Sequence, residues 1–354
     1  MATSSEKAII VSHPLINSIP PELEARFDPA YLEYYNKYSA GRLATHQVPI
    51  ESYRADPAKY TTVYGRQRVD QGNLIITEQE CPVEGGSIAI RIFQPEAAEK
   101  APGPRPVYIN FHGGGWVFGG LVTDFDFCKR LALETGCVCF DVDYRLAPEY
   151  KFPIPLNDCW AGFQWVRDHK DEFNIDVNRI AIGGASAGGH LSAVVAHFCR
   201  DAGIPLAFQV LAVPVCDLHV FTPEGALRPD QPYESYREMY YTQPLPAERM
   251  AYFHKKFLGD PRPASLDDDW KVSPIKAPNF KDLAPAIVIT AEMDPLRDEG
   301  EAYGKKMNEA GSKAQIVRVP GVPHVFMQMD DFLEGGKLFN KLVIKALNEA
   351  FATT

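Results

Sequence analysis

Short apolar runs alternate with longer segments of helical periodicity from about residue 67 onward. Residues 107–111 are almost continuously apolar, which is typical of a strand that is buried on both faces of a sheet. Similar runs predict further strands at 73–77, 87–93, 137–142, 179–182, 207–213, 286–290 and 314–319. Apolar residues at helical spacing predict helices at about 122–135, 156–170, 187–201, 298–311 and 334–352. This alternation, with short connections, predicts an α/β fold with a mostly parallel central sheet and helices on both of its faces.

Two regions interrupt this alternation. Residues 1–60 are rich in Tyr and Pro and precede the first strand, and their aromatic content argues against a disordered tail. Residues 217–272 follow a predicted strand with helical, Tyr-rich and Pro-rich sequence, and an insertion of this length at the end of a strand is typical of a cap over a site. We therefore expect a catalytic α/β domain made of residues 61–216 and 273–354, covered by a helical cap made of residues 1–60 and 217–272.

Charge and composition exclude several classes of partner. The 354-residue chain has a net charge of −10 and no cluster of Lys and Arg, so nucleic acid is not an expected partner. No apolar run approaches the ~20 residues of a membrane-spanning helix, and the apolar segment 8–11 is too short for the core of a signal peptide. The seven cysteines are odd in number and lack zinc-like spacing. We expect a soluble, cytoplasmic protein with no metal site and no structural disulfide.

The segment Gly184-Ala-Ser-Ala-Gly188 has the pattern G-x-S-x-G between a predicted strand and a predicted helix. In that setting Ser186 would occupy a strained strand-to-helix turn, and side chains at positions 184 and 188 would collide with neighbouring backbone. The pattern predicts that Ser186 is a nucleophile. The pentapeptide alone leaves open a glycine-rich loop without chemistry.

A second glycine-rich segment, His112-Gly-Gly-Gly-Trp116, follows the strand predicted at 107–111. Three glycines allow backbone N–H groups to face a cavity, where they can bind the negative oxygen that forms when a carbonyl is attacked. We expect the amides of Gly113, Gly114 and Ala187 to form this oxyanion hole. A phosphate-binding loop is the weaker interpretation, because neither G-x-G-x-x-G nor a Walker lysine follows.

A serine hydroxyl needs a neighbouring base. Of the nine histidines, His324 alone lies after the last predicted strand, in a turn rich in Pro and Gly. His190 and His197 lie on the helix after the nucleophile and are expected to be packing residues. His219 and His254 lie in the 217–272 insertion and could at most contact substrate.

The acid that orients the base should follow the strand predicted at 286–290. Asp294 lies in that position, with Pro295 behind it. Its expected role is to hold the imidazole in one tautomer and to stabilise the imidazolium. Glu292 and Asp298 are the alternatives, and Asp298 is expected to begin the next helix.

Taken together, these motifs resemble the hormone-sensitive-lipase family of esterases, also called family IV. The matching segments are His112-Gly-Gly-Gly-Trp116, Asp143-Tyr-Arg-Leu-Ala-Pro-Glu149, Gly183-Gly-Ala-Ser-Ala-Gly-Gly189, Asp294-Pro-Leu-Arg-Asp-Glu299 and Pro323-His324. The resemblance implies an α/β-hydrolase fold with a cap, no cofactor, and the triad Ser186, Asp294 and His324. It also implies residues 144–149 as scaffold of the oxyanion loop, and homodimers are common in the family. Ala185 departs from the Asp that such proteins usually have, which leaves the subfamily and pH optimum open.

The expected function is hydrolysis of short- to medium-chain or aryl carboxylic esters, with a small-molecule ester as the partner. The same residues could cleave an amide, lactone or formamide, or transfer an acyl group. A non-catalytic small-molecule receptor is a further alternative, although receptors resembling this family tend to lack the histidine. Trp116, Tyr236 and Tyr240 are expected to line the substrate pocket, and the alternative is that the aromatic residues of the insertion form the cap's own core.

Overall fold

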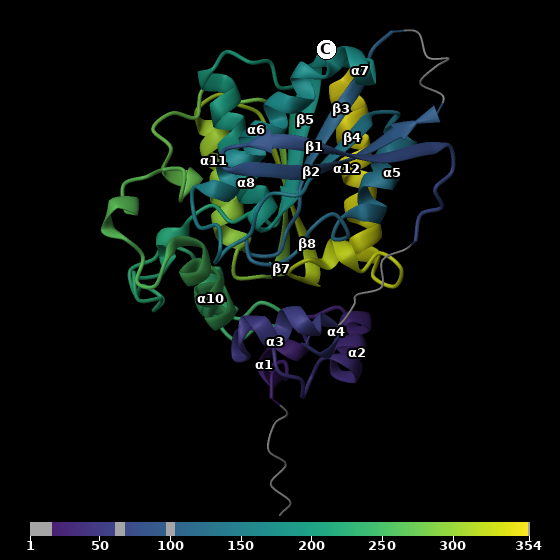
Figure 1. Ribbon diagram of the computed structural model, residues 1–354. Coiled ribbons are helices and arrows are strands. Elements are labelled where there is room, and N and C mark those ends of the chain that lie inside the picture. Colours follow the sequence, from purple (N-terminus) through teal and green to yellow (C-terminus); the bar gives the residue numbers. More distant parts are fainter. Residues whose placement is uncertain (1–15, 61–67, 97–102, 353–354) are drawn as a thin grey trace, which may run out of the picture.

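The computed structural model of the chain describes residues 16–60, 68–96 and 103–352. It contains a central eight-stranded sheet with helices on both faces (Figure 1). In chain order the strands are β1 (Leu74–Val83), β2 (Gly86–Pro95), β3 (Arg105–Phe111), β4 (Val138–Val142), β5 (Ile175–Ala185), β6 (Phe208–Ala212), β7 (Ala286–Met293) and β8 (Ala314–Pro323). Their spatial order is β1-β2-β4-β3-β5-β6-β7-β8, and the pairings from β4 to β8 are all parallel. The predicted α/β fold with a mostly parallel sheet is confirmed.

The centre of the sheet is buried on both faces. All five residues of β4 are buried, and so are the last five residues of β3. This explains why residues 107–111 carry a continuous apolar pattern and not an alternating one. At the edge, β1 is longer than the strand predicted at 73–77, because its second half carries exposed polar side chains that give no apolar signal.

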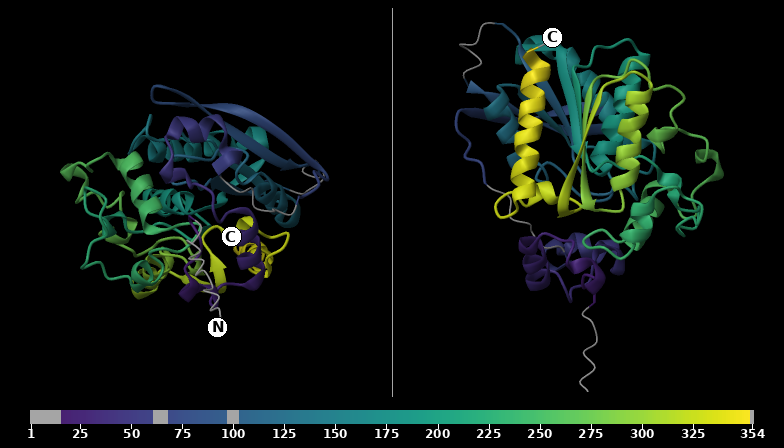
Figure 2. Two further views of the ribbon diagram at one scale, coloured as in Figure 1. Left: turned by 90° about the horizontal axis from the view of Figure 1, so that it is seen from below. Right: turned by 180° about the vertical axis from the view of Figure 1, so that it is seen from behind.

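The main helices cover the sheet in two groups. In chain order they are α5 (Phe125–Thr135), α6 (Ile154–Asp168), α7 (Lys170–Phe173), α8 (Ala187–Asp201), α11 (Arg297–Glu309) and α12 (Glu334–Ala352). Residues of α5 and α12 share one hydrophobic cluster with one face of the sheet, while α6, α8 and α11 pack on the opposite face (Figure 2). The five predicted helices are confirmed.

The helices outside this pattern lie beyond the carboxyl ends of the parallel strands (Figure 1). They are α1 (Pro21–Glu24), α2 (Pro29–Tyr38), α3 (Ile50–Ala55), α4 (Pro57–Tyr60), α9 (Glu234–Glu238) and α10 (Ala247–Leu258). The N-terminal segment is attached to later parts of the chain: the Tyr31 hydroxyl donates to the Gln243 carbonyl at 2.9 Å, and the Asp28 N–H donates to the Gly321 carbonyl at 2.7 Å. Residues 16–60 therefore form part of the folded body. The apolar segment 8–11 lies outside the described residues.

Across the described ranges, every helix is too short or too polar to cross a membrane.

Candidate active site

Ser186 lies between the end of β5 and the beginning of α8, with φ of 57° and ψ of −115°. Its N–H donates to the Ala212 carbonyl at 2.9 Å, which fixes the strained turn against β6. A Cβ atom at Gly184 or at Gly188 would collide with the carbonyl oxygen of Phe111. The expected backbone collisions at these two positions are confirmed, and they explain why the turn has glycine on both sides of the serine.

The structure brings Ser186, His324 and Asp294 together. His324 follows β8, and its Nε2 lies 3.0 Å from the Ser186 Oγ, while its Nδ1 lies 2.7 Å from the Asp294 Oδ2. Asp294 follows β7 and is completely buried, whereas Ser186 keeps 8% of its surface exposed and His324 keeps 6%. A carboxylate can only accept hydrogen bonds, so Nδ1 carries the ring hydrogen and Nε2 is free to accept the serine proton.

The two alternative acids are occupied elsewhere. The Glu292 carboxylate accepts the Gly321 N–H at 2.8 Å. Asp298 lies in the first turn of α11, as expected, and accepts the Ser235 N–H and the Arg297 Nε–H at 2.7 Å each. Asp294 is therefore the carboxylate that reaches the imidazole.

The three amides expected to form the oxyanion hole belong to Gly113, which approaches the Ala185 carbonyl, to Gly114, and to Ala187, which directly follows Ser186. Within the described residues none of the three N–H groups has a hydrogen-bond acceptor. Ala187 is the first residue of α8, so its N–H also lies at the positive end of the helix dipole. Gly114 has φ of 122°, and a Cβ there would collide with the Phe118 carbonyl, which accounts for glycine at this position. Such donors stabilise the oxyanion of a tetrahedral intermediate.

Residues 144–149 contact the 112–116 loop and hold it in position. The Tyr144 hydroxyl donates to the His112 carbonyl at 2.7 Å, and the two rings stack with centroids 4.2 Å apart. The Ala147 N–H donates to the Trp116 carbonyl at 2.8 Å. Arg145 forms a bidentate ion pair with the buried Asp158, at 2.8 and 2.7 Å. These contacts hold both ends of the 112–116 loop in place.

Ala185 borders a small internal cavity of about 20 Å³, beneath the serine turn. Tyr108, Asn110 and Met327 also line it, and a cavity of this size accommodates about one water molecule. The Tyr108 hydroxyl has no hydrogen-bond partner among the residues that the structure describes. The Ala185 methyl group therefore leaves unfilled space beside a polar group.

The other histidines of the central region are packing residues. His190 donates from Nε2 to the Lys271 carbonyl at 2.9 Å and accepts the Trp116 Nε1–H at 3.3 Å, while His197 lies 3.2 Å from the Tyr303 hydroxyl. Burial lowers the pKa of His190 to about 4 and that of His197 to about 3. His219 contacts the Ser273 hydroxyl at 2.7 Å. These rings are neutral at pH 7, and the packing role expected for His190 and His197 is confirmed.

The burial of His254 predicts a measurable pH dependence of the unfolding free energy. Its pKa is lowered to about 3, first by burial and then by the charge of Arg262. Below pH 6.5 the unfolded chain binds a proton at this histidine and the folded chain does not, so acid favours unfolding. In His254→Phe, we expect the fall of unfolding free energy between pH 6 and pH 4.5 to be shallower by about 1.4 kcal/mol per pH unit. Urea unfolding at a series of pH values measures both slopes, and equal slopes would contradict the prediction.

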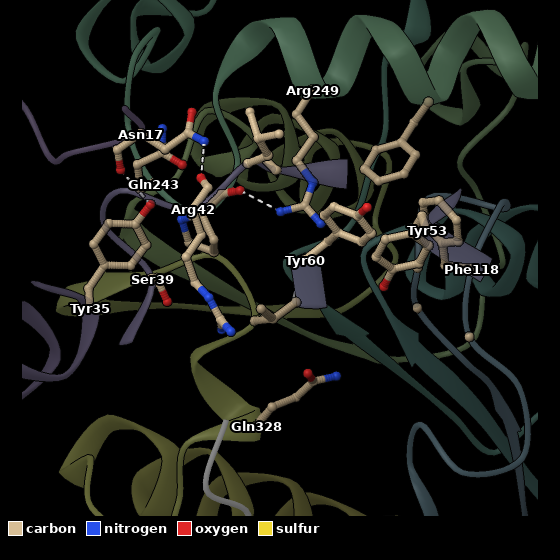
Figure 3. Close-up of a pocket in the computed structure, with 18 of the residues that line it drawn as sticks. Asn17, Tyr35, Ser39, Arg42, Tyr53, Tyr60, Phe118, Gln243, Arg249 and Gln328 are labelled. Atoms are coloured by element: carbon tan, nitrogen blue, oxygen red, sulfur yellow. Dashed lines mark hydrogen bonds between the residues drawn. The ribbon is translucent and has the colours of Figure 1, made fainter. Parts of the chain in front are cut away.

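A cavity of about 300 Å³ lies over the oxyanion loop (Figure 3). Gly113 and Gly114 form part of its wall, and so does Val325, next to His324. The remaining wall comes from residues 17–60, from residues 243–253 in and before α10, and from Phe118, Gly119, Thr123 and Gln328. Its aromatic side chains are Tyr35, Tyr53, Tyr60, Phe118 and Phe253.

The expected pocket residues lie elsewhere. Trp116 is 1% exposed and stacks on Phe257 with ring centroids 4.4 Å apart, so it packs beneath the oxyanion loop. Tyr236 is fully buried and donates its hydroxyl to Glu299 at 2.7 Å. Tyr240 is half-buried and does not line the cavity. None of the three lines this cavity, because aromatic content indicates burial but not whether a side chain faces a cavity or a packed core.

The polar residues of the cavity wall were missed by the sequence analysis. They include Asn17, Arg42, Gln243, Arg249 and Gln328. Four of them lie in the 1–60 and 217–272 regions and Gln328 lies in the turn after β8, where no periodic pattern or motif marks a position as facing the cavity. The described part of the chain contains no group of three or more His, Cys, Asp or Glu side chains that could hold a metal ion.

Comparisons with known proteins show the family to which the chain belongs. A family model for the α/β-hydrolase fold matches residues 108–328. An α/β-hydrolase superfamily protein of Schizosaccharomyces pombe is 32% identical over an alignment covering 99% of this chain and 100% of that protein. An ethyl acetate hydrolase of Pseudomonas putida is 29% identical, with 91% of this chain and 98% of that protein covered. The crystal structure of a thermostable carboxylesterase from a metagenomic library superposes with a TM-score of 0.72 at 37% identity, covering 80% of this chain and 91% of that one. The chain therefore belongs to the α/β-hydrolase family, of the hormone-sensitive-lipase type that its motifs resemble.

Proposed function

We propose that this protein is a serine carboxylesterase that hydrolyses short- to medium-chain or aryl carboxylic esters through an acyl-enzyme intermediate. The relatives named ethyl acetate hydrolase and carboxylesterase support the reaction class. The observation that carries the assignment of roles is the placement of His324, within hydrogen-bond distance of both the Ser186 hydroxyl and the Asp294 carboxylate. The imidazole of His324 thus links a nucleophile to an orienting acid.

In the first half-reaction, the Ser186 Oγ attacks the ester carbonyl carbon while His324 Nε2 takes the hydroxyl proton. Asp294 stabilises the imidazolium that results, through the Nδ1–H hydrogen bond. The oxyanion accepts hydrogen bonds from the amides of Gly113, Gly114 and Ala187. When the bond between the carbonyl carbon and the alcohol oxygen breaks, His324 protonates the leaving alcohol.

In the second half-reaction, water takes the place of the alcohol. His324 removes a proton from water, whose oxygen attacks the acyl carbon of the esterified Ser186. The same three amides hold the second oxyanion. Collapse of this intermediate returns the proton to the Ser186 Oγ and releases the carboxylic acid, so the enzyme ends in its starting state.

The division of the chain is part of the proposal. Residues 61–216 and 273–354 form the catalytic domain, and residues 1–60 and 217–272 form the cap, of which the part before residue 16 is not described. The cavity over the oxyanion loop supports this division, because its wall combines residues 17–60 with residues 243–253. A small-molecule ester is the proposed partner and nucleic acid is not. Cytoplasmic localisation, in keeping with seven buried free cysteines, and homodimer formation remain predictions.

An active-site fluorophosphonate probe tests the assignment of the nucleophile. We expect one adduct per chain, located at Ser186 by peptide mapping, and loss of p-nitrophenyl butyrate hydrolysis at the same rate as labelling. Heat-denatured protein is the control and should not react, because activation of the hydroxyl depends on His324 in the folded state. An adduct at another residue, or labelling without loss of hydrolysis, would refute the proposal.

A further inference from the structure

The cavity over the oxyanion loop has an unusual charge. Two arginines, Arg42 and Arg249, lie in its wall, and among the described residues that line it none is Asp or Glu. The chain as a whole has a net charge of −10, with 46 acidic and 36 basic residues. A positive cavity in an acidic protein is a local property of the site and does not follow from composition.

Arg249 lies on α10, and Figure 3 shows its guanidinium directed into the cavity. Its Nη1 donates to the Pro244 carbonyl at 2.8 Å, and the guanidinium lies over the Phe253 ring, 5.6 Å from the centroid. Its Nε is buried and has no acceptor among the residues described. A guanidinium offers five N–H donors, and leaving a buried donor without an acceptor is energetically unfavourable. Arg249 can therefore bind a further hydrogen-bond acceptor, which the described residues do not supply.

Arg42 enters the same cavity from the segment that follows α2 (Figure 3). Its side chain makes one long hydrogen bond, from Nη1 to the Tyr38 carbonyl at 3.4 Å. Its backbone is held by the Asn17 amide, which donates to the Arg42 carbonyl at 2.6 Å. The backbone is therefore fixed while the charged end of the side chain stays available.

Several arginines outside the cavity have a carboxylate partner. Arg145 pairs with Asp158, Arg262 with Asp267, and Arg297 with Asp298. Within the described ranges, Arg42 and Arg249 form no such pair. Arg105, Arg167 and Arg228 also lack a carboxylate partner there, but only Arg42 and Arg249 lie together in the wall of one cavity.

We propose that the ester substrate carries a carboxylate, and that Arg249 and Arg42 bind it in this cavity. The inference rests on the proposed carboxylesterase function and specifies its substrate class. Gly113 and Gly114 belong to the same wall, so a short chain can place its ester carbonyl at the oxyanion loop and its carboxylate at the arginines. The aromatic side chains of the cavity wall can pack against the methylene groups that connect the ester and the carboxylate. A guanidinium can bind a carboxylate through two parallel hydrogen bonds.

Matched ester pairs test the proposal. Monoethyl succinate and ethyl butyrate differ in a carboxylate on the acyl side, while 3-acetoxypropanoate and propyl acetate differ in a carboxylate on the alcohol side. In at least one pair we expect kcat/KM of the wild type to be about tenfold to a hundredfold higher for the anionic ester, the range typical of a charge-assisted hydrogen bond. Raising the salt concentration should reduce this preference.

Variants assign the preference to the two arginines. Arg249→Met and Arg42→Met should each reduce the anionic-to-neutral ratio of kcat/KM about tenfold, and Arg249→Lys should retain part of it. Lys345→Met is the control, since it removes one positive charge from a side chain that is 74% exposed on α12, and it should leave the ratio unchanged. As a readout of binding alone, succinate should inhibit p-nitrophenyl acetate hydrolysis more strongly than butyrate. Thermal unfolding shows whether each variant is folded.

Three negative results have different meanings. A ratio close to one in both pairs, together with equal inhibition by succinate and butyrate, would overturn the carboxylate proposal while leaving hydrolysis of neutral esters intact. A wild type that hydrolyses neither member of either pair and does not react with the fluorophosphonate would overturn the esterase function as well. A preference that survives in both Met variants would show that other residues bind the carboxylate, which also contradicts the proposal.

Discussion

Replacing Ser186 by Ala is expected to lower kcat for p-nitrophenyl butyrate by about 10⁶-fold, the loss typical of a triad that acts as a unit. The Ser186 Oγ is the atom that would form the acyl-enzyme, and His324 Nε2, 3.0 Å away, would be left without a proton to remove. The oxyanion amides remain in this variant, so a small residual rate above that of water is expected. Initial rates at saturating substrate measure the change. The wild type is assayed under the same conditions at a lower enzyme concentration.

Ser192→Ala is the matched control for this experiment. Ser192 lies further along the same helix, is fully buried, and donates its hydroxyl to the Gly188 carbonyl at 2.8 Å. Its loss removes a buried hydroxyl and one hydrogen bond, which should lower stability by about 1 kcal/mol and change kcat by less than about tenfold. Activity of Ser186→Ala close to that of Ser192→Ala would show that the acyl group is not carried by Ser186.

Replacing Asp294 by Asn is expected to lower kcat by about 10⁴-fold, because the imidazole is held in the wrong tautomer. The two carboxylate oxygens of Asp294 have separate tasks: Oδ2 accepts the His324 Nδ1–H at 2.7 Å, and Oδ1 accepts the Leu296 N–H at 3.1 Å. An amide has a single oxygen, which is retained by the Leu296 N–H if the NH₂ group faces the imidazole. In that orientation Nδ1 must accept, Nε2 carries the hydrogen, and His324 no longer accepts the serine proton.

Glu292→Gln and Asp298→Asn are the controls, since both remove a charge from a carboxylate close in sequence to Asp294. Glu292 binds the Gly321 N–H and Asp298 binds Arg297, so kcat should fall by less than about tenfold in each. A larger loss in Asp298→Asn than in Asp294→Asn would reassign the acid.

Much of the sheet could be predicted because its central strands are buried on both faces. Every residue of β4 is buried, and a fully apolar run of that length leaves few alternatives to a central strand. The edge strand β1 was predicted too short, since polar residues such as Glu78 and Glu80 pair with β2 through backbone hydrogen bonds, which leave no mark on the side-chain pattern.

The residues of the candidate active site could also be predicted from the arrangement of the strands. Each follows the carboxyl end of a strand, and in a parallel sheet these ends meet along one edge, so residues 138 positions apart in the chain, Ser186 and His324, arrive in contact. Glycines at 113, 114, 184 and 188 mark places where the backbone must come close to another atom. Such constraints are local, and therefore visible in sequence.

The cavity wall could not be predicted, because no local constraint determines it. Arg249 faces the cavity and Tyr236 faces Glu299, yet both lie in short helices of the same insertion. Which side of such a helix faces a cavity depends on how it packs against residues 16–60, a contact between parts of the chain that the sequence pattern does not connect. The sequence analysis therefore identified the proposed catalytic residues, but not the residues that we propose to select the substrate.

The positions of the arginines have a consequence for how this protein can diverge. Serine, imidazole, carboxylate and amides all project from the strand ends of the sheet, whereas Arg42 and Arg249 belong to two helical segments laid over it. Substitutions in those segments can exchange one class of ester for another while the hydrolytic apparatus keeps its geometry. On the proposed roles of these residues, substrate selectivity and catalytic reactivity depend on separate stretches of the sequence, so one can change in evolution without the other.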